Sequence, residues 1–219
     1  MEITNPKIIA VITMNGRHKT VDYCANKMPW LHKVYVVSEP DDYHFILKYP
    51  NTTVISHKNN PLSAKWQSGL FHLKNLDFDA VMILGSDDWM TFETYQFICN
   101  KISEGHDFVG FKDCYFRNDD IDYYWSGYRR KDRKSEPIGA GRTISKSALI
   151  SMNWILFPKL LDESLDRTSW PQIVRHTKNR YKAKLKEHNL YMVDIKDEES
   201  MNSISVIPNL INEGLTKFL

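Results

Sequence analysis

The N-terminal half of the chain alternates short apolar runs with stretches of helical pattern, and this alternation restricts the possible folds more than any other feature. Four runs rich in β-branched and apolar residues predict buried strands at residues 7–13, 33–38, 52–56 and 79–84. Helical patterns lie between and after them, and the clearest one, over residues 61–76, has a proline near its first turn. Strands that alternate with helices at short intervals predict an α/β fold, with a mostly parallel sheet flanked by helices.

The C-terminal half has a different pattern. Residues 106–130 are rich in aromatic and β-forming side chains with turn signals between them, and they predict antiparallel strands or a hairpin. A glycine turn then leads into a helix that begins near Ser145, and a loop is expected over residues 157–170. A last helix is expected over residues 169–188, with Ser169 as its N-cap, before a final short strand.

Composition and charge narrow the possibilities further. No repeat or linker interrupts the 219 residues, no apolar run approaches the length of about 18 residues that a membrane span needs, and the N-terminus lacks a signal-peptide pattern. The three cysteines have no metal-ligand spacing and predict a reduced, cytoplasmic chain. The net charge of +2 predicts no partner, but basic stretches at residues 129–134 and 175–186 predict an electropositive end.

Two adjacent carboxylates, Asp87 and Asp88, directly follow the fourth predicted strand in the segment ILGSDDWM. Ligands of an open parallel sheet bind beyond the carboxyl ends of its strands, where this turn should lie. Adjacent carboxylates repel each other, and Mg²⁺ takes one or two carboxylates and completes its shell with phosphate oxygens. The pair therefore indicates a metal that carries a diphosphate. The alternative is a solvated turn or a helix cap, because Asp-Asp is common in loops.

The first predicted strand is followed by neither a Gly-x-Gly-x-x-Gly loop nor a Gly-Lys-Ser/Thr phosphate loop, which argues against a dinucleotide-dependent dehydrogenase and a kinase. Six stretches, in order, resemble GT-A glycosyltransferases of the family 2 group, including small versions common in phages. They are IIAVITMNGR, NNPLSAKWQSGL, VMILGSDDWM, GAGRTISKSAL, LDESLDRTSW and MVDIKDEESMNS. The sequence departs from the family at Gly85, where the Asp-x-Asp motif has its first aspartate.

This resemblance implies a GT-A, Rossmann-like fold in a single catalytic domain over residues 1–219. Residues 1–104 would form the nucleotide-sugar-binding half, and residues 105–219 the acceptor-side half with a small antiparallel extension. The implied reaction moves a sugar from a nucleotide-diphosphate sugar, such as a UDP-sugar, to an acceptor hydroxyl with the help of Mn²⁺ or Mg²⁺. A nucleotidyltransferase also uses paired aspartates, but it carries a glycine-rich basic first loop that TMNGRH lacks.

The resemblance also implies roles for individual residues. Asp88 would bind the metal, and Asp87 would bind the metal or the donor ribose. Lys65 or Lys196 would place a positive charge beside the departing diphosphate. Three further residues would frame the nucleotide base and ribose: Thr13, Asn15 and Arg17.

An inverting transfer needs a carboxylate that takes the proton of the acceptor hydroxyl. The late loop offers three candidates: Asp162, Glu163 and Asp166. Asp166 matches the family position best, and we expect it to be the catalytic base. It could instead bind the metal or cap the following helix, and a retaining transfer would require no such base.

The segment YYWSGYRRKDRK interleaves aromatic and basic side chains, which suit unstacked bases and phosphates. Small phage GT-A enzymes include some that modify hydroxymethylated pyrimidines in DNA, so the resemblance suggests DNA as the acceptor, in the cytoplasm of a phage's host. Trp125, Arg129 and Arg130 would bind it, while Gly139 and Gly141 would let the backbone approach the sugar or acceptor. The alternatives are a saccharide or other cell-surface acceptor, and a non-catalytic module that binds nucleotide sugars or nucleic acid.

Overall fold

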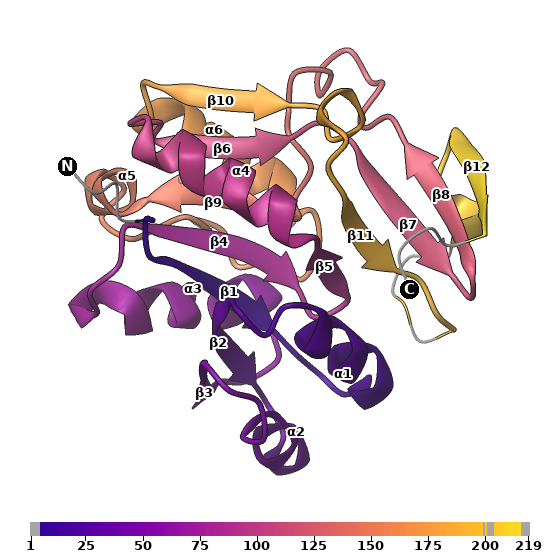
Figure 1. Ribbon diagram of the computed structural model, residues 1–219. Helices are drawn as coiled ribbons and strands as arrows, with labels where there is room; N and C mark the ends of the chain where they lie inside the picture. Colours follow the sequence, from indigo (N-terminus) through magenta and orange to yellow (C-terminus); the bar gives the residue numbers. More distant parts are fainter. Residues whose placement is uncertain (1–4, 199, 201–203, 216–219) are drawn as a thin grey trace.

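The structure, a computed structural model, describes residues 5–198, 200 and 204–215 (Figure 1). Within these residues the main sheet has seven strands in the order β10-β6-β9-β4-β1-β2-β3. Along the chain they are β1 (Ile8–Thr13), β2 (His32–Val37), β3 (Thr52–Ser56), β4 (Ala80–Gly85), β6 (Phe108–Phe111), β9 (Arg142–Ser145) and β10 (Arg180–Ala183). The first four are parallel to one another, whereas β9 runs antiparallel to β4 and β6. The expected mostly parallel sheet is confirmed.

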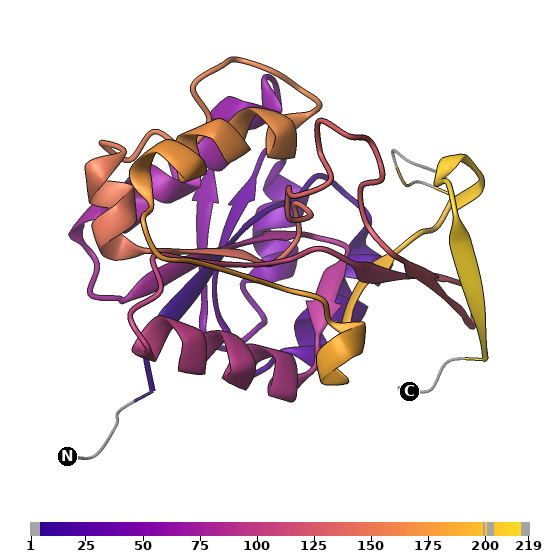
Figure 2. The same ribbon diagram turned by 90° about the horizontal axis from the view of Figure 1, so that it is seen from above.

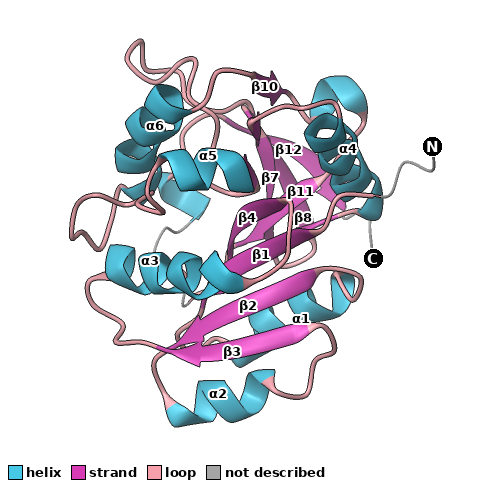
Figure 3. Cartoon of the chain, turned by 90° about the vertical axis from the view of Figure 1, so that its left-hand side faces the viewer, coloured by secondary structure: helices cyan, strands magenta, loops and turns pink. Residues whose placement is uncertain are grey.

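Helices cover both faces of this sheet. They are α1 (His18–Lys27), α2 (Pro40–Ile46), α3 (Leu62–His72), α4 (Phe92–Ser103), α5 (Lys146–Ser151) and α6 (Leu165–His176), with 3₁₀ turns at Leu73–Asn75, Lys186–His188 and Ile204–Val206. α3, α5 and α6 pack on one face, and α1, α2 and α4 on the other (Figure 2, Figure 3). Successive side chains of β1 alternate between these two cores, as in a sheet buried on both faces. No described helix has the length and hydropathy that a membrane span requires.

A second, smaller sheet lies beside the carboxyl ends of β1 and β4 (Figure 1). In the described part of the chain its strand order is β12-β8-β7-β11-β5. The strands are β5 (Asp88–Met90), β7 (Cys114–Asn118), β8 (Ile121–Trp125), β11 (Met192–Ile195) and β12 (Leu210–Leu215). β7 and β8 form the expected antiparallel hairpin, and β11 pairs antiparallel with β5 and parallel with β7. The small antiparallel extension is thus confirmed.

The limits of the last helix differ from the prediction. α6 begins at Leu165, so Ser169 lies inside the helix rather than at its N-cap, and the expected loop before it is shorter. The helix ends at His176, and the basic helix expected over residues 169–188 is therefore wrong over its C-terminal half. The helix start near Ser145 is confirmed, because its hydroxyl caps α5.

Most of the second basic stretch forms a turn and an edge strand instead. The carboxylate of Asp107 accepts hydrogen bonds from the backbone N–H groups of Lys178 and Asn179, at 2.8 and 3.0 Å, and so stabilises the turn. The chain then enters β10, which pairs parallel to β6. Pairing with a strand about 70 residues earlier thus overrides the local helical pattern. β5, β9 and β12, which pair with distant segments, were not predicted either.

Candidate metal and nucleotide site

A cleft of about 760 Å³ opens at the carboxyl ends of β1 and β4. Turns that follow these strands form part of its walls, as expected for an open parallel sheet. The residues that the sequence assigned to the donor or the metal all line it: Thr13, Asn15, Arg17, Lys65, Asp87, Asp88 and Lys196. The fold therefore brings these side chains together from segments that are far apart in the chain.

Three carboxylates gather in this cleft, those of Asp87, Asp88 and Asp194, with one oxygen of each within 4.8 Å of the others. Asp88 begins β5, and Asp194 lies directly opposite it on β11. Asp194 was not predicted, although the acid in the closing stretch MVDI was a signal for it. Like charges directly opposite each other in a sheet are destabilising, so this register favours a bound cation.

The surroundings of these carboxylates oppose their negative charge. Burial and the charge of Asp87 raise the pKa of Asp88 to about 7. The same two causes raise the pKa of Asp194 well above its usual value, against the opposing effect of Lys196. Asp194 Oδ1 is buried and receives no hydrogen bond from any described residue. The three aspartates therefore fit a divalent metal, since Mg²⁺ and Mn²⁺ prefer carboxylate oxygens as ligands.

Gly85 explains how the carboxylates of this turn pack together. Its backbone N–H donates to Asp88 Oδ2 at 2.6 Å. A Cβ atom on Gly85 would lie 2.6 Å from Asp87 Oδ1 and 2.9 Å from Asp88 Oδ2, which is closer than a Cβ atom approaches its neighbours. A side chain at position 85 would therefore require the ends of both carboxylates to shift, which gives a steric reason for the departure from the family's Asp-x-Asp motif.

Two cations flank the cluster. Lys196 Nζ lies 2.7 Å from Asp194 Oδ2, so it is placed beside the position expected for a diphosphate. The guanidinium of Arg17, at the start of α1, bridges Asp87 at 2.7 Å and Asp197 at 2.9 Å. Arg17 therefore supports the turn that carries Asp87 and Asp88. It also lines the cleft where the donor ribose was expected.

Lys65 has surroundings unlike those of Lys196. It is fully buried, at 0% exposure, and burial lowers its pKa to about 8. Its Nζ donates to the carbonyl oxygen of Met14, to Ser38 Oγ at 2.7 Å and to Asn59 Oδ1 at 3.0 Å. These bonds use all three ammonium hydrogens and leave none for the diphosphate contact expected from the sequence.

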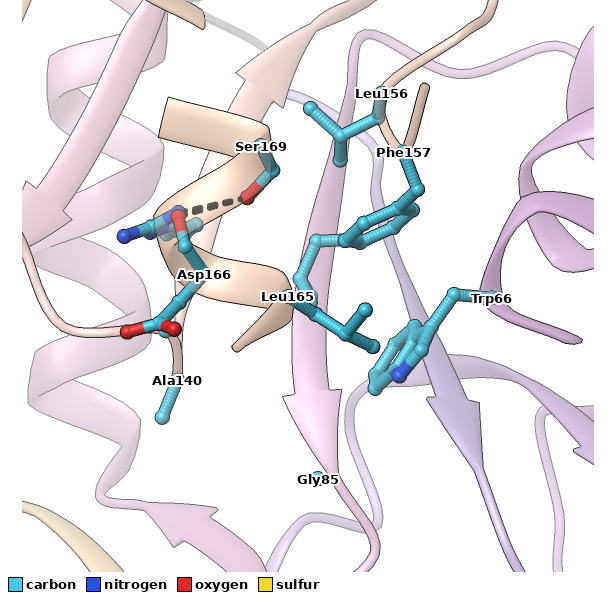
Figure 4. Close-up of a pocket in the computed structure, with 11 residues that line it drawn as sticks. Trp66, Gly85, Ala140, Leu156, Phe157, Leu165, Asp166 and Ser169 are labelled. Carbon is cyan, nitrogen blue, oxygen red and sulfur yellow. Dashed lines mark hydrogen bonds between the residues drawn. The ribbon is translucent and has the colours of Figure 1, made fainter. Parts of the chain in front are cut away.

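A smaller cavity of about 180 Å³ adjoins the cleft and shares Trp66, Gly85 and Ala140 with it. Asp166, the expected base, lies on one side of this cavity, and Phe157 and Trp66 lie on the other (Figure 4). Most of the remaining lining residues are apolar. The site thus has a mostly apolar pocket that reaches the turn with Asp87 and Asp88 at Gly85.

Several donors hold Asp166 in place. Its Oδ2 accepts hydrogen bonds from the Tyr128 hydroxyl and from Arg133, and its Oδ1 accepts one from the backbone N–H of Arg167 at 2.8 Å. Burial alone would raise the pKa of this carboxyl, but the hydrogen bond from Tyr128 and the charges of Arg142 and Arg133 outweigh burial and lower the pKa. Asp166 is therefore ionised at neutral pH, and it lies outside the described carboxylate cluster.

The two glycines expected at the acceptor face different surroundings. Gly139 lines the small cavity and also a third cavity of about 290 Å³, in which Trp125 forms part of the wall. Gly141 packs against the core instead, since a Cβ atom there would lie 2.1 Å from Met192 Cε, and its φ of 71° is a second reason for glycine at this position. Its glycine is required for packing of the strand behind the site.

Arg129 and Arg130 lie on an exposed loop, and neither is among the described residues that line these cavities. Arg130 pairs with Asp132 at 3.0 Å. The same loop meets the second basic stretch, because Lys182 Nζ on β10 donates to the carbonyl oxygen of Ser135 at 3.3 Å. The two basic stretches therefore share one edge of the molecule.

No family model matches the chain, and no curated protein matches it. Among solved structures, it is similar to a TarS fragment of S. aureus, residues 1–349, with 15% identity and a TM-score of 0.65. The match covers 86% of this chain and 60% of the fragment, so the chain spans less than two thirds of that length.

A197 from STIV is similar over 97% of this chain and 98% of its own, with 14% identity and a TM-score of 0.54. This chain has a GT-A-like fold. A 4-diphosphocytidyl-2C-methyl-D-erythritol synthase from Anaerococcus prevotii is also similar, over 89% of this chain and 88% of its own, with 13% identity and a TM-score of 0.52. At these identities the similarity shows the fold alone, and nucleotide-sugar transferases are among the proteins that have this fold. It confirms the GT-A-like fold that the sequence motifs had suggested.

Proposed function

We propose that this GT-A-like protein transfers a sugar from a nucleotide-diphosphate sugar to an acceptor hydroxyl with the help of a divalent metal. The observation that carries the proposal is the cluster of Asp87, Asp88 and Asp194, whose oxygens lie within 4.8 Å of one another. The cluster lies in a cleft of about 760 Å³, a volume in the range of sites for small-molecule ligands. A partly buried, all-carboxylate cluster in such a cleft suits a metal that carries a diphosphate.

Departure of the nucleoside diphosphate is the first half of the reaction. The bond between sugar C1 and the diphosphate oxygen breaks, and the oxygen keeps the electron pair. A metal held by the three aspartates would neutralise the charge that develops there. Lys196 adds a positive charge beside the cluster, and Arg17, 2.7 Å from Asp87, orients the turn that carries two of the carboxylates.

Attack by the acceptor is the second half. The acceptor oxygen forms the new bond to sugar C1, and in our proposal its proton passes to Asp166. Tyr128 and Arg133 both bind Oδ2 and fix the carboxylate, whereas Oδ1 has one donor, the backbone N–H of Arg167, among the described residues. Oδ1 therefore has a free lone pair for the acceptor hydroxyl.

For the acceptor we propose a 5-hydroxymethylpyrimidine in DNA, with a UDP-sugar as donor and Mn²⁺ or Mg²⁺ as the metal. The contact of Lys182 with the end of the loop that carries the first basic stretch supports this choice, because basic side chains that lie near one another can neutralise backbone phosphates. The loop that carries Arg129 and Arg130 also carries Arg133, which binds Asp166. A base flipped into the small apolar cavity would present its hydroxyl to Asp166.

Mass spectrometry of nucleosides tests both parts of the proposal. DNA with hydroxymethylcytosine or hydroxymethyluracil is incubated with the protein, Mn²⁺ or Mg²⁺ and a panel of nucleotide sugars. We expect an adduct of sugar mass that disappears in Asp88→Ala. The matched control Asp77→Ala removes an exposed carboxylate outside the described cavities, and the adduct should persist.

Two other outcomes separate the parts. Donor hydrolysis that requires Asp88, without a DNA adduct, would support the transfer chemistry and overturn DNA in favour of a saccharide acceptor. The absence of both adduct and hydrolysis would overturn the enzyme proposal and favour a non-catalytic binding module.

A further inference from the structure

Tyr128 and Asp166 belong to the walls of two different cavities. Tyr128 lines the third cavity of about 290 Å³, whereas Asp166 lines the small cavity of about 180 Å³. The two cavities meet at Gly139 and Ala140, which line both. The hydroxyl of Tyr128 donates a hydrogen bond to Asp166 Oδ2. One hydrogen bond therefore joins the wall of the third cavity to the proposed base.

The chain and the aromatic neighbours fix the place of Tyr128. Gly127 has a φ of 86°, and a Cβ atom there would overlap the carbonyl oxygen of Lys112, so the backbone passes tightly against the residue after β6. Trp125, at the end of β8, meets the Tyr128 ring edge-on, with the ring centroids 5.1 Å apart. Trp125 also lines the third cavity. The position of the Tyr128 hydroxyl is thus set from the side of the third cavity.

The two arginines beside Asp166 divide their hydrogen bonds between several oxygens. Arg133 donates to Asp166 Oδ2 at 2.5 Å, but the same nitrogen donates to Glu136 Oε1 at 2.8 Å. Arg142 donates to the backbone carbonyl oxygen of Asp166 at 2.6 Å and to Glu136 at 3.1 Å. A hydroxyl has a single hydrogen, so the bond of Tyr128 goes to the carboxylate alone. Tyr128 is therefore the more selective of the two side chains that hold Oδ2.

Tyr128 also supports the other donor to Oδ2. The guanidinium carbon of Arg133 lies 3.5 Å from the centroid of the Tyr128 ring, which is a close cation–π contact. The ring thus holds Arg133, and the hydroxyl holds Asp166. Replacing the tyrosine by phenylalanine removes the second contact and keeps the first, so the two can be tested separately.

We propose that Tyr128 is a positioning residue for Asp166, and that the aromatic wall of the third cavity acts on the base through it. The inference rests on the proposed function, which makes Asp166 the base. Donors on Oδ2 stop the carboxylate from rotating, so Oδ1 stays available for the acceptor hydroxyl. The same hydrogen bond favours the ionised carboxylate and makes it a weaker base. Trp125, which the sequence assigned to the acceptor, would then also orient the base.

Carbon-13 NMR of the Asp166 carboxyl carbon, assigned by its loss in Asp166→Asn, tests the inference without any substrate. The titration runs from pH 7 down to the lowest pH at which a thermal melt shows the protein folded. In Tyr128→Phe the midpoint should rise by about one pH unit, the value of one hydrogen bond to a charged group. The matched control Tyr124→Phe removes a hydroxyl that donates to Asp113 at 3.0 Å, and it should leave the midpoint unchanged.

The charged groups around Asp166 are the same in both variants, so the lost hydroxyl is the difference between them. On the loop before β9, on β9 and on α6 these groups are Arg133, Glu136, Arg142 and the pair of Arg167 with Asp132.

Trp125→Leu tests the path from the third cavity. The change removes the aromatic edge against Tyr128 and should raise the Asp166 midpoint by less than Tyr128→Phe does. In the double variant it should add nothing to Tyr128→Phe, because the effect passes through the hydroxyl. Full additivity of the two shifts would overturn this path.

Release of UDP from UDP-glucose in Mn²⁺, with water as the acceptor, shows the effect on the reaction. In Tyr128→Phe, kcat should fall about tenfold although the base is stronger, because the carboxylate is less well oriented. KM for UDP-glucose should stay the same, and the acid limb of the pH profile should move up with the NMR midpoint. A merely structural role would leave the acid limb in place.

The outcomes distinguish this inference from the proposed function. An unchanged Asp166 midpoint in Tyr128→Phe, or a shifted midpoint with unchanged kcat, would overturn the positioning role and leave sugar transfer standing. If the unmodified protein neither releases UDP nor forms an adduct, the proposed function and the inference are overturned together.

Discussion

The carboxylates of the site fall into two environments of opposite character. Asp88 and Asp194 face each other across β5 and β11, where burial and the charge of Asp87 raise their pKa values. Asp166, in the first turn of α6, is also partly buried, but its pKa is lowered by Tyr128 and by neighbouring arginines, Arg133 among them. Burial acts in the same direction in both places, so the difference comes from the donors around each carboxylate.

The two environments differ in whether protein donors already satisfy the carboxylate. The cluster contains a carboxylate oxygen that lacks a partner among the described residues, whereas the charge of Asp166 is balanced by an arginine. This oxygen is Asp194 Oδ1, which no described residue satisfies and which is therefore open to a cation. Asp166 has a guanidinium at 2.5 Å and is fixed without any ligand. A metal ligand benefits from the first arrangement. The second fixes the position of Asp166 and keeps it ionised, but it also makes the carboxylate a weaker base.

The largest effect should follow from Asp194→Asn. We expect Mn²⁺ affinity to fall at least about 100-fold. Changing a residue that merely supports a metal ligand costs up to about 100-fold in metal affinity, and loss of a ligand itself should cost no less. The metal-free variant should unfold at a higher temperature, because one of three repelling carboxylates is gone. Calorimetry measures the first effect and a thermal melt the second. Unchanged Mn²⁺ affinity would show that Asp194 does not bind the metal, and the proposed difference between the cluster and Asp166 would then be wrong.

Asp166→Asn should have the opposite effect on stability. The free energy of unfolding should fall by about 2 kcal/mol, because Arg133 and Arg142 lose one of their two counter-charges in a partly buried site and keep only Glu136. Sugar transfer should fall about 100-fold or more if Asp166 is the base. Urea unfolding and initial rates measure the two effects. Glu163→Gln, an exposed rival in the loop before α6, should change neither. A stable but inactive Asp166→Asn would show that the arginines tolerate its loss and that its role is purely catalytic.

Gly85→Ala should have a smaller effect, confined to the cluster. The added Cβ would lie 2.6 Å from Asp87 Oδ1, so the carboxylates must shift apart. We expect Mn²⁺ affinity to fall about tenfold, in line with the cost of overpacking a tight site, while the pKa of Asp166 stays as it is. Unchanged Mn²⁺ affinity would show that the turn accommodates a side chain, and the missing first aspartate would need another explanation.

The smallest effect should be the pH dependence of stability in EDTA. Asp88 has a pKa of about 7 in the folded protein, and about 4 is usual for an unfolded chain. Between these values unfolding releases a proton, so the contribution of Asp88 to stability is full below pH 4 and is lost as pH rises toward 7. Asp166 has the opposite sign, because its lowered pKa stabilises the fold above that range and is lost in acid. Urea unfolding from pH 4 to 8 should show a shallower decline in Asp88→Asn, and an unchanged decline would contradict the assignment.

Local patterns in the sequence determined the core of the fold and two of the three carboxylates of the candidate metal site. β1, β2 and β4 were predictable because a buried parallel strand reads as a nearly continuous apolar run, whatever it later pairs with. β3 is a partly exposed edge strand, and it was predictable from its β-branched residues. Asp87 and Asp88 were predictable because they directly follow one of these runs, and the carboxyl end of a parallel strand is where ligands bind.

Tertiary structure decided the rest, because the deciding contacts join segments that are far apart in the chain. Asp194 reaches Asp88 only through the pairing of β11 with β5, and β10 leaves its helical pattern only because β6 is there to pair with it. Lys65 binds oxygens from three separate segments, and these partners decide where its ammonium points. These strand pairings and side-chain orientations depend on hydrogen-bond partners and counter-charges from other segments. Those partners become neighbours only when the chain is folded.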